Sequence, residues 1–245
     1  TPFKQFILTV KHASRYGPLI EKILSHPILS FISFTLLRRA YQFDLSFPRY
    51  VCLLIICFIF QRLKLTGYFL YEHIPDKVSY IDWFESLELP DTFTSWFAIT
   101  ELHVWMIMVR YMVEDVASPI NEKKKYIKGD GHFVRNCIIE AMWADVGNKI
   151  KLLEGANPAI ARKQVAELSE QFQASLVAYD EGLNDDKILA AAIWRRFYSL
   201  SDDVKVDHIE RIVKFVRHQI SELDKIPSED LSWKPDIKWL DILNH

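Results

Sequence analysis

The stretch FTSWFAITELHVWMIMVRYMV, residues 93–113, decides the fold class of this chain. Apolar side chains would lie on every side of a helix drawn through it, and a helix of that kind is usually buried at the centre of a protein. Pro90 breaks the chain just before it, and Asp91 or Thr92 supplies a side chain that can cap its first turn. The stretch therefore predicts a long central helix around which other helices pack.

The segments on either side of this stretch also have helical patterns. Helices are expected over residues 18–25, 27–40, 62–73, 80–87, 132–153, 158–180, 187–200 and 206–225. Pro48 and Pro75 are expected to break or end helices, because proline lacks the amide proton that a helix interior needs. Ser79 is expected to cap the helix that follows it, and Gly182 to take the left-handed conformation at a helix end.

The chain is predicted to be all-α: a single multi-helix domain with a partly irregular C-terminal tail that begins at Pro227. No stretch alternates apolar and polar side chains between hairpin turns, as a β-strand would. Residues 115–131 combine proline and glycine with polar side chains and predict the clearest loop. The short connections elsewhere imply that neighbouring helices are antiparallel.

Composition excludes several classes of site. The net charge is −2 with acidic and basic residues interspersed, which is unlike the basic footprint of a nucleic-acid binder. Cys52, Cys57 and Cys137 are an odd number without a C-x-x-C pair, so neither a disulfide framework nor a zinc site is predicted. The sequence also lacks the nucleotide-binding, serine-hydrolase and zinc-protease motifs. We therefore predict no catalytic residue, no metal site and no cofactor.

The N-terminal segment, residues 1–61, precedes the helical domain predicted over residues 62–245. It contains the most apolar run of the chain, VCLLIICFIF at residues 51–60. This run has ten residues, whereas a spanning helix needs about 20, so it is too short to cross a bilayer. We expect the segment to be helical and apolar, and either partly disordered or associated with a membrane.

Two alternatives for this segment stay open. In the first, residues 28–60 anchor a membrane-associated helical scaffold. In the second, residues 51–61 are a retained intron, because Val-Cys and Phe-Gln can be encoded by GTATGT and TTTCAG, which match the ends of many introns. Removal of that segment would join Tyr50 to Arg62, and sequencing of the spliced transcript decides the matter.

His103 is the most unusual residue of the central stretch, because it is titratable and its neighbours are apolar. Trp96, His103 and Arg110 follow at intervals of seven residues and so line one face of a helix. His103 could be an acid, a haem ligand, or a core residue bonded to a backbone carbonyl. We favour the last and keep a haem-handling protein as the alternative. The predicted structural core comprises Trp96, His103, Trp105, Trp143 and Trp194.

Two segments carry a resemblance to a known family. They read LELPDTFTSWFAITELHVWMIMVR at residues 87–110 and AYDEGLNDDKILAAAIWRRFY at residues 178–198. Together with M-W-x-D-V at residues 142–146 and N-P at residues 157–158, which occur in matching order, they resemble the ubiquinol–cytochrome c reductase assembly chaperone family. The resemblance covers roughly residues 63–223.

The resemblance implies a non-enzymatic, all-helical protein on the matrix side of the mitochondrial inner membrane, with peripheral membrane association. Members of the family work with a small partner protein and associate with the mitochondrial ribosome. They bind newly made cytochrome b, the membrane subunit of complex III, and hold it until haem is inserted and other subunits join. These expectations come from the resemblance and not from composition or periodicity.

Such a protein needs a surface that recognises an apolar helix, and helix-in-groove contact is the natural mode of recognition. The acidic residues between Asp180 and Asp186 do not fit a calcium loop, and helix capping explains them. Arg195 and Arg196 would either pair with these acids or face a partner. The predicted partner-binding residues are Trp83, Leu89, Pro90, Asp91, Thr92, Asp180, Glu181, Arg195 and Arg196.

Overall fold

The computed structural model describes residues 47–116, 130–153, 158–233 and 236–244. The helices expected over residues 18–25 and 27–40, and most of the expected loop, lie outside the described residues. The chain divides into two units, Thr1–Arg62 and Leu63–His245. The packing described below belongs to the second unit.

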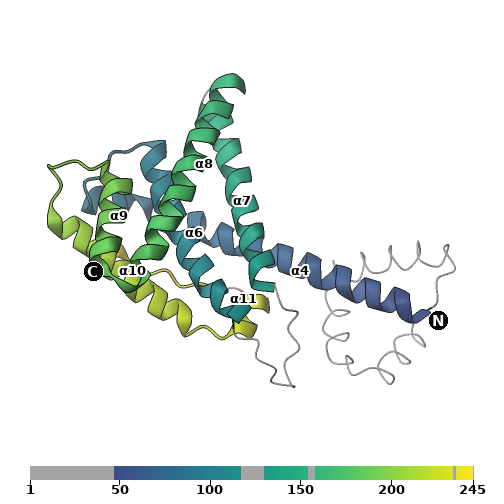
Figure 1. Cartoon of the computed structure of the whole chain (residues 1–245). Helices are drawn as coiled ribbons and strands as arrows, with labels where there is room; N and C mark the ends of the chain where they lie inside the picture. Colours follow the sequence, from purple (N-terminus) through teal and green to yellow (C-terminus); the bar gives the residue numbers. More distant parts are fainter. Residues whose placement is uncertain (1–46, 117–129, 154–157, 234–235, 245) are drawn as a thin grey trace. The chain divides into compact units, whose positions relative to one another are not determined.

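The described residues are helical almost throughout, and no strand occurs among them (Figure 1). This confirms the predicted all-α class. The α-helices are α4 (Phe47–Lys77), α5 (Tyr80–Ser86), α6 (Phe93–Val116), α7 (Asp130–Leu153), α8 (Pro158–Glu181), α9 (Asp186–Tyr198), α10 (Val206–Asp224) and α11 (Ser228–Trp233). Two short 3-10 helices complete the order, η1 (Gly182–Asn184) between α8 and α9 and η2 (Ile242–Asn244) near the C-terminus.

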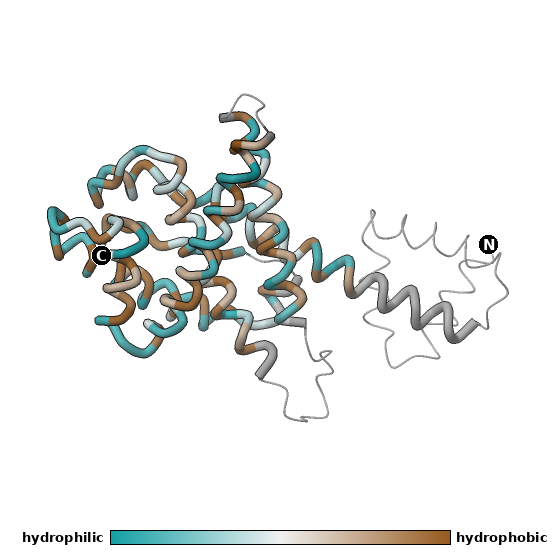
Figure 2. Tube along the Cα trace, turned by 45° about the horizontal axis from the view of Figure 1, so that its top comes forward, coloured by the Kyte–Doolittle hydropathy of each residue, from teal (hydrophilic) through white to brown (hydrophobic). Residues whose placement is uncertain are grey.

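Helix α6 is the centre of the second unit, as its all-round apolar sequence predicts. It packs against α5, α7, α8, α9 and α10. Phe97, Ile99, Leu102 and Val104 are completely buried, although they point to different sides of the helix. Each such side chain contributes about 1.5–3 kcal/mol of hydrophobic stabilisation. The other helices alternate hydrophobic and hydrophilic residues along their length, as helices covering a core do (Figure 2).

Helix α4 is longer than the sequence suggests. Pro48 and Pro75 both lie inside it, at its two ends: α4 begins at Phe47 and ends at Lys77, so the expected helix end near Pro75 is right to within two residues. Pro48 is the second residue of α4, where no partner carbonyl exists for its missing amide proton. Pro75 lies in the last turn, so it removes only one of the final hydrogen bonds. No helix among the described residues, α4 included, is long and apolar enough to span a membrane.

The C-terminal half of α4 lies against α7. Gly67 makes this possible, because a Cβ atom at that position would lie 2.5 Å from Cβ of Cys137. Two polar contacts flank the close approach: Lys64 pairs with Glu140 at 3.2 Å, and Tyr71 donates to Asp145 at 2.6 Å. A larger residue at position 67 would force the two helices apart.

Side-chain caps fix the start of two helices, one on each side of the core. The hydroxyl of Thr92 accepts from the amide of Ser95 at 3.2 Å, and Asp185 accepts from the amide of Lys187 at 2.8 Å. Ser79 precedes α5 as predicted but makes no capping hydrogen bond through its side chain. The capping of α5 by the Ser79 side chain is therefore a wrong prediction, although the position of the helix start is right.

Gly182 is required for a different reason from the one expected. It opens the 3-10 turn η1 and does not adopt a left-handed φ, so the prediction of a left-handed cap is wrong. A Cβ atom there would lie 2.7 Å from Cα of Leu189, because the end of α8 packs directly on α9. Arg217 of α10 donates to the carbonyl oxygen of Gly182 at 2.7 Å and pairs with Asp186 at 2.8 Å, which fastens the turn.

Candidate functional site

A largely buried ion pair joins α6 and α9. Nε and Nη2 of Arg196 donate to the two carboxylate oxygens of Glu101 at 2.5 Å and 3.0 Å. The side chains are 9% and 1% exposed, so both charges have left water. Tyr179 of α8 adds a hydrogen bond to Glu101 at 3.4 Å. Three helices thus meet at one carboxylate.

Electrostatics at this cluster follow from burial. Burial raises the pKa of Glu101, and the guanidinium group of Arg196 works against that rise. Burial also raises the pKa of Tyr179, and the neighbouring Glu101 carboxylate raises it further. Removing the positive charge would therefore leave a carboxylate that neither water nor a cation stabilises.

The two segments that carry the family resemblance are held together by such contacts. Trp105 donates through Nε1 to Asp180 at 2.8 Å, and Tyr198 donates to the carbonyl oxygen of Leu87 at 3.2 Å. With the Glu101–Arg196 pair, these bonds link α6 and the turn before it to α8 and α9. The shared motifs therefore specify how three helices pack.

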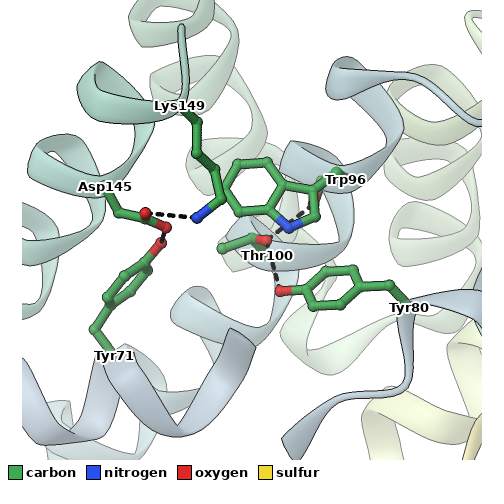
Figure 3. A network of polar contacts seen from close by, with 6 residues as sticks. All are labelled: Tyr71, Tyr80, Trp96, Thr100, Asp145 and Lys149. Atoms are coloured by element: carbon green, nitrogen blue, oxygen red, sulfur yellow. Dashed lines mark hydrogen bonds and ion pairs between the residues drawn. The ribbon is translucent and has the colours of Figure 1, made fainter. Parts of the chain in front are cut away.

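A second polar network joins α4, α5, α6 and α7 (Figure 3). Asp145 accepts from Tyr71 at 2.6 Å and from Lys149 at 2.5 Å, and the ammonium group of Lys149 lies 4.9 Å from the ring centroid of Trp96. Thr100 donates to the carbonyl oxygen of Trp96 at 2.9 Å, so its hydroxyl is free to accept a bond from another residue. Burial, then the Asp145 carboxylate, raises the pKa of Tyr71, which therefore stays a neutral donor.

Tyr80 supplies the link from this network to α5. Its hydroxyl lies 2.9 Å from Oγ1 of Thr100, and because the proton of Thr100 goes to a carbonyl, Tyr80 is the donor. Burial raises the pKa of Tyr80 to about 12, which keeps it protonated at neutral pH. Like the ion pair, the network connects helices and leaves none of these groups directed at a reactant.

His103 lies in the core and is bonded to a backbone carbonyl, as we favoured. Its Nδ1 lies 2.7 Å from the carbonyl oxygen of Ile99, which can only accept, so Nδ1 carries the proton. The side chain is completely buried, and burial lowers its pKa to about 4. A haem iron would bind Nε2, which this structure does not expose. Arg110 lies two helical turns after His103 and donates to the carbonyl oxygens of Leu223 and Ile226 near the end of α10.

His103 gives the fold a defined response to acid. The ordinary pKa of histidine is about 6.5, and the folded value is about 4, so between these values only the unfolded chain takes up the proton. Stability is thus unaffected by this group above pH 6.5 and falls by about 3 kcal/mol as the pH drops to 4. We expect His103→Gln to flatten that part of the curve of unfolding free energy against pH, measured by urea titration. An unchanged slope would contradict the assignment.

The predicted partner-binding residues divide by exposure. Trp83 and Leu89 are 2% and 6% exposed, so the prediction that they form a surface is wrong. Arg196 is committed to the buried carboxylate of Glu101. The remaining predicted residues are exposed: Pro90, Asp91, Thr92, Asp180, Glu181 and Arg195.

The exposed members do not gather in one patch. The turn that holds Pro90 meets the C-terminal end of α9, where Tyr198 bonds to Leu87. Asp180 and Glu181 lie beyond the N-terminal end of α9. A helix of that length separates its ends by about 18 Å. The two groups therefore flank α9 and would contact different parts of a partner.

Three of the four tryptophans predicted for the core are only half-buried: Trp96, Trp143 and Trp194. Trp105 is 1% exposed and confirms its prediction. The ammonium group of Lys149 lies 4.9 Å from the ring centroid of Trp96, and Trp194 donates to the carbonyl oxygen of Ser201 at 2.8 Å. The indole N–H favours the edge of a core, where a polar partner is within reach.

Sequence patterns gave no sign of two exposed apolar side chains near the acidic group. Val177 of α8 is 60% exposed and Ile188 of α9 is 42% exposed. Val177 precedes Glu181 by one helical turn, and Ile188 precedes Arg195 by two. The sequence alone does not show that Val177 and Ile188 are exposed, because their exposure depends on how α8 packs on α9. Among the described residues, no group of histidine, cysteine and acidic side chains could hold a metal ion.

The fold and its buried networks define an all-helical domain whose core polar groups join helices to one another. The chain belongs to the ubiquinol–cytochrome c chaperone family, whose model matches residues 85–235. The ubiquinol–cytochrome c reductase complex assembly factor 1 of Drosophila melanogaster is 48% identical over 182 residues, which are 74% of this chain and 66% of the fly protein. Its human counterpart is 34% identical over 73% of this chain and 55% of its own length.

More distant relatives agree. Protein CBP3, mitochondrial, of Saccharomyces cerevisiae is 26% identical over 66% of this chain and 45% of the yeast protein. The crystal structure of the Cbp3 homologue from Brucella abortus superimposes with a TM-score of 0.51 at 19% identity, covering 75% of this chain and 90% of that one, and shows the same fold. The chain spans somewhat under two thirds of the fly relative and about half of the human and yeast ones.

Proposed function

We propose that this chain is an assembly chaperone of mitochondrial respiratory complex III that binds newly synthesised cytochrome b. The observation that carries the proposal is membership of a family whose relatives are named as assembly factors of ubiquinol–cytochrome c reductase. In this proposal the chain has no catalytic role and works by contact alone. It acts with a small partner protein and the mitochondrial ribosome, at the matrix side of the inner membrane, where it is a peripheral protein.

The polar residues of the core join helices to one another and leave binding to the exposed residues, which supports this proposal. The charges of Glu101 and Arg196 neutralise each other, and Arg110 and Arg217 donate to carbonyl oxygens at helix ends. A chaperone that works by contact needs a rigid scaffold and an adaptable surface, and these groups supply the scaffold. Binding would then depend on the exposed residues.

We place part of the partner-binding surface at the α8–α9 corner, which we define as Val177, Asp180, Glu181, Ile188 and Arg195. It combines exposed apolar side chains with charges of both signs. An amphipathic helix of a partner would bury its apolar face on the exposed apolar side chains and pair its flanking charges with the charged side chains of the corner. The turn residues Pro90, Asp91 and Thr92, at the other end of α9, would extend this surface.

Charge reversal at Arg195 tests the placement. Arg195 is exposed and its side chain makes no hydrogen bond or ion pair with the residues that the structure describes, so Arg195→Glu should leave the fold intact. We expect it to reduce recovery of the small partner protein with the tagged chain at least tenfold, and to lower cytochrome b in the same mitochondria. Lys214→Glu, on the exposed side of α10, is the matched control and should leave both unchanged. Equal recovery with the two variants would remove the α8–α9 corner from the proposed surface.

A further inference from the structure

The C-terminal residues Asp236–Asn244, which we call the strap, follow the end of the family match at residue 235. They nevertheless contribute to the core, since Ile237 and Ile242 are 0% and 1% exposed. The 3-10 helix η2 at the end of the strap packs against α5 and α10. The strap is therefore a docked segment, mostly non-helical, on a helical unit.

The side chain of Gln219 makes two hydrogen bonds to the backbone of the strap, and Lys77 adds a longer one to the carbonyl oxygen of Ile237 at 3.4 Å. Gln219 of α10 is completely buried, and its Nε2 donates to the carbonyl oxygen of Lys238 at 3.3 Å while its Oε1 accepts from the amide of Leu240 at 2.8 Å. The side-chain amide of Gln219 thus donates one hydrogen bond to an extended backbone and accepts one from it, as a neighbouring β-strand would. Lys77 adds an ion pair to Asp236 at 2.5 Å. Both hydrogen bonds of the Gln219 side chain go to main-chain atoms, so they do not depend on which side chains the extended segment carries.

Trp239 covers His103 and leaves two polar atoms without partners. The two rings meet edge to face, with centroids 4.7 Å apart. Because Nδ1 of His103 carries the proton, Nε2 is an acceptor, and it is buried without a donor. The Nε1 donor of Trp239 is also buried without an acceptor. Buried polar groups without partners cost free energy, so the strap is held less firmly than its apolar burial alone would make it.

Beneath Trp239 lies a set of aromatic rings that we call the aromatic floor: Trp83, His103 and Phe215. Their centroids are 5.0–5.6 Å apart, and they come from α5, α6 and α10. Trp83 and Phe215 are 2% and 0% exposed while the strap is docked. Because Trp239 packs on His103, release of the strap would uncover that ring of the aromatic floor together with the backbone-binding amide of Gln219.

We propose that the strap is a displaceable cover, and that the aromatic floor with Gln219 is a docking site for an extended apolar segment of a partner. The strap shows what such a segment must offer: a main chain for Gln219 and large apolar side chains at the places of Ile237, Trp239 and Ile242. The chemistry of the partner segment rests on the proposed function, in which the client is an apolar membrane subunit. Displacement of the strap does not depend on that function.

Hydrogen exchange in the intact chain tests the displacement. The amide of Leu240 is protected only by Gln219, so it should exchange through local release of the strap. We expect its opening equilibrium to be about a hundredfold more favourable than that of core amides in α6, such as Leu102, and to vary little with urea. If Leu240 exchanged with the same opening equilibrium and urea dependence as Leu102, the strap would be part of the cooperative core and the proposal would fail.

A peptide with the sequence DIKWLDILN, residues 236–244, tests the docking site. Labelled with fluorescein, it should bind the full-length Trp239→Ala chain at least tenfold more tightly than the wild type, whose own strap competes. The same peptide with alanine in place of tryptophan should not bind. If the peptide bound to neither chain, the proposed docking site would be wrong. This outcome does not depend on whether the protein binds cytochrome b. Should circular dichroism show Trp239→Ala unfolded, Ile242→Ala takes its place, because it removes a buried side chain of the strap and leaves the docking site intact, with the same expected order of affinities.

Discussion

Replacing Arg196 with methionine should lower the free energy of unfolding by about 3–5 kcal/mol. Methionine fills a similar volume but leaves the carboxylate of Glu101, 1% exposed, without its cation. Burial already raises the pKa of Glu101, so the acid would have to take up a proton or stay charged in the core. Urea titration followed by tryptophan fluorescence measures the loss.

Two further variants separate the ion pair from a general effect of removing arginine. Arg195→Met changes the exposed neighbour and should alter stability by no more than about 0.5 kcal/mol. Glu101→Leu combined with Arg196→Met removes both charges and should recover most of the loss, because an apolar pair needs no compensation. A stability loss under about 1 kcal/mol for Arg196→Met alone would mean that the pair does not hold α6 to α9.

Trp83→Ala should cost about 3–5 kcal/mol of stability, which is the usual effect of emptying a buried tryptophan site. Trp83 is 2% exposed and contacts the rings of His103, Phe197 and Phe215. Calorimetric or urea unfolding of the purified chain checks this. Trp194→Ala is the comparison, because Trp194 is half-buried and should cost clearly less.

The same variant distinguishes a core residue from an interface anchor. An exposed tryptophan at an interface would be lost with little change in stability and a large loss of partner binding. A Trp83→Ala chain as stable as the wild type, but deficient in partner binding, would restore the surface role that the sequence suggested. The expected result is the opposite: the chain loses stability, as it does when a buried side chain is removed.

The central helix shows why part of the fold follows from local sequence. Its apolar residues occur on every side, so burial on every side is the only arrangement that removes them from water. The caps at Thr92 and Asp185 lie where helices start, because their side-chain oxygens satisfy free amides there. These are effects of a few neighbouring residues, and they were predicted correctly.

Trp83 and Arg196 show where local sequence fails. Trp83 lies on a seven-residue helix, too short for an apolar stripe to reveal which side faces the core. Arg196 lies 95 residues from Glu101, and nothing near either residue indicates that they pair. Both were proposed as partner-binding residues, and Arg196 lies in one of the segments that carry the family resemblance. The structure shows that this arginine makes a contact between two helices that are far apart in the sequence.

Proline marks the ends of α4 to within a few residues. The rule that it breaks helices applies to interiors, and Pro48 and Pro75 lie in the first and last turns of α4. The residue type alone does not show whether a proline lies at the end or in the interior of a helix, so it does not determine the bounds of α4. Gly182 was correctly singled out, but the close approach of Leu189 requires it and a left-handed turn does not.

The most direct test of the proposed function is to label mitochondrial translation products with a short pulse of radioactive methionine and then purify the tagged chain under mild conditions. If the chain is a chaperone for newly made cytochrome b, that product should be enriched with it at least tenfold over the other labelled products, and the enrichment should fall during a chase as complex III forms. Two results together would contradict the proposal: no labelled cytochrome b is recovered with the tagged chain, and mitochondria that lack the chain assemble complex III normally.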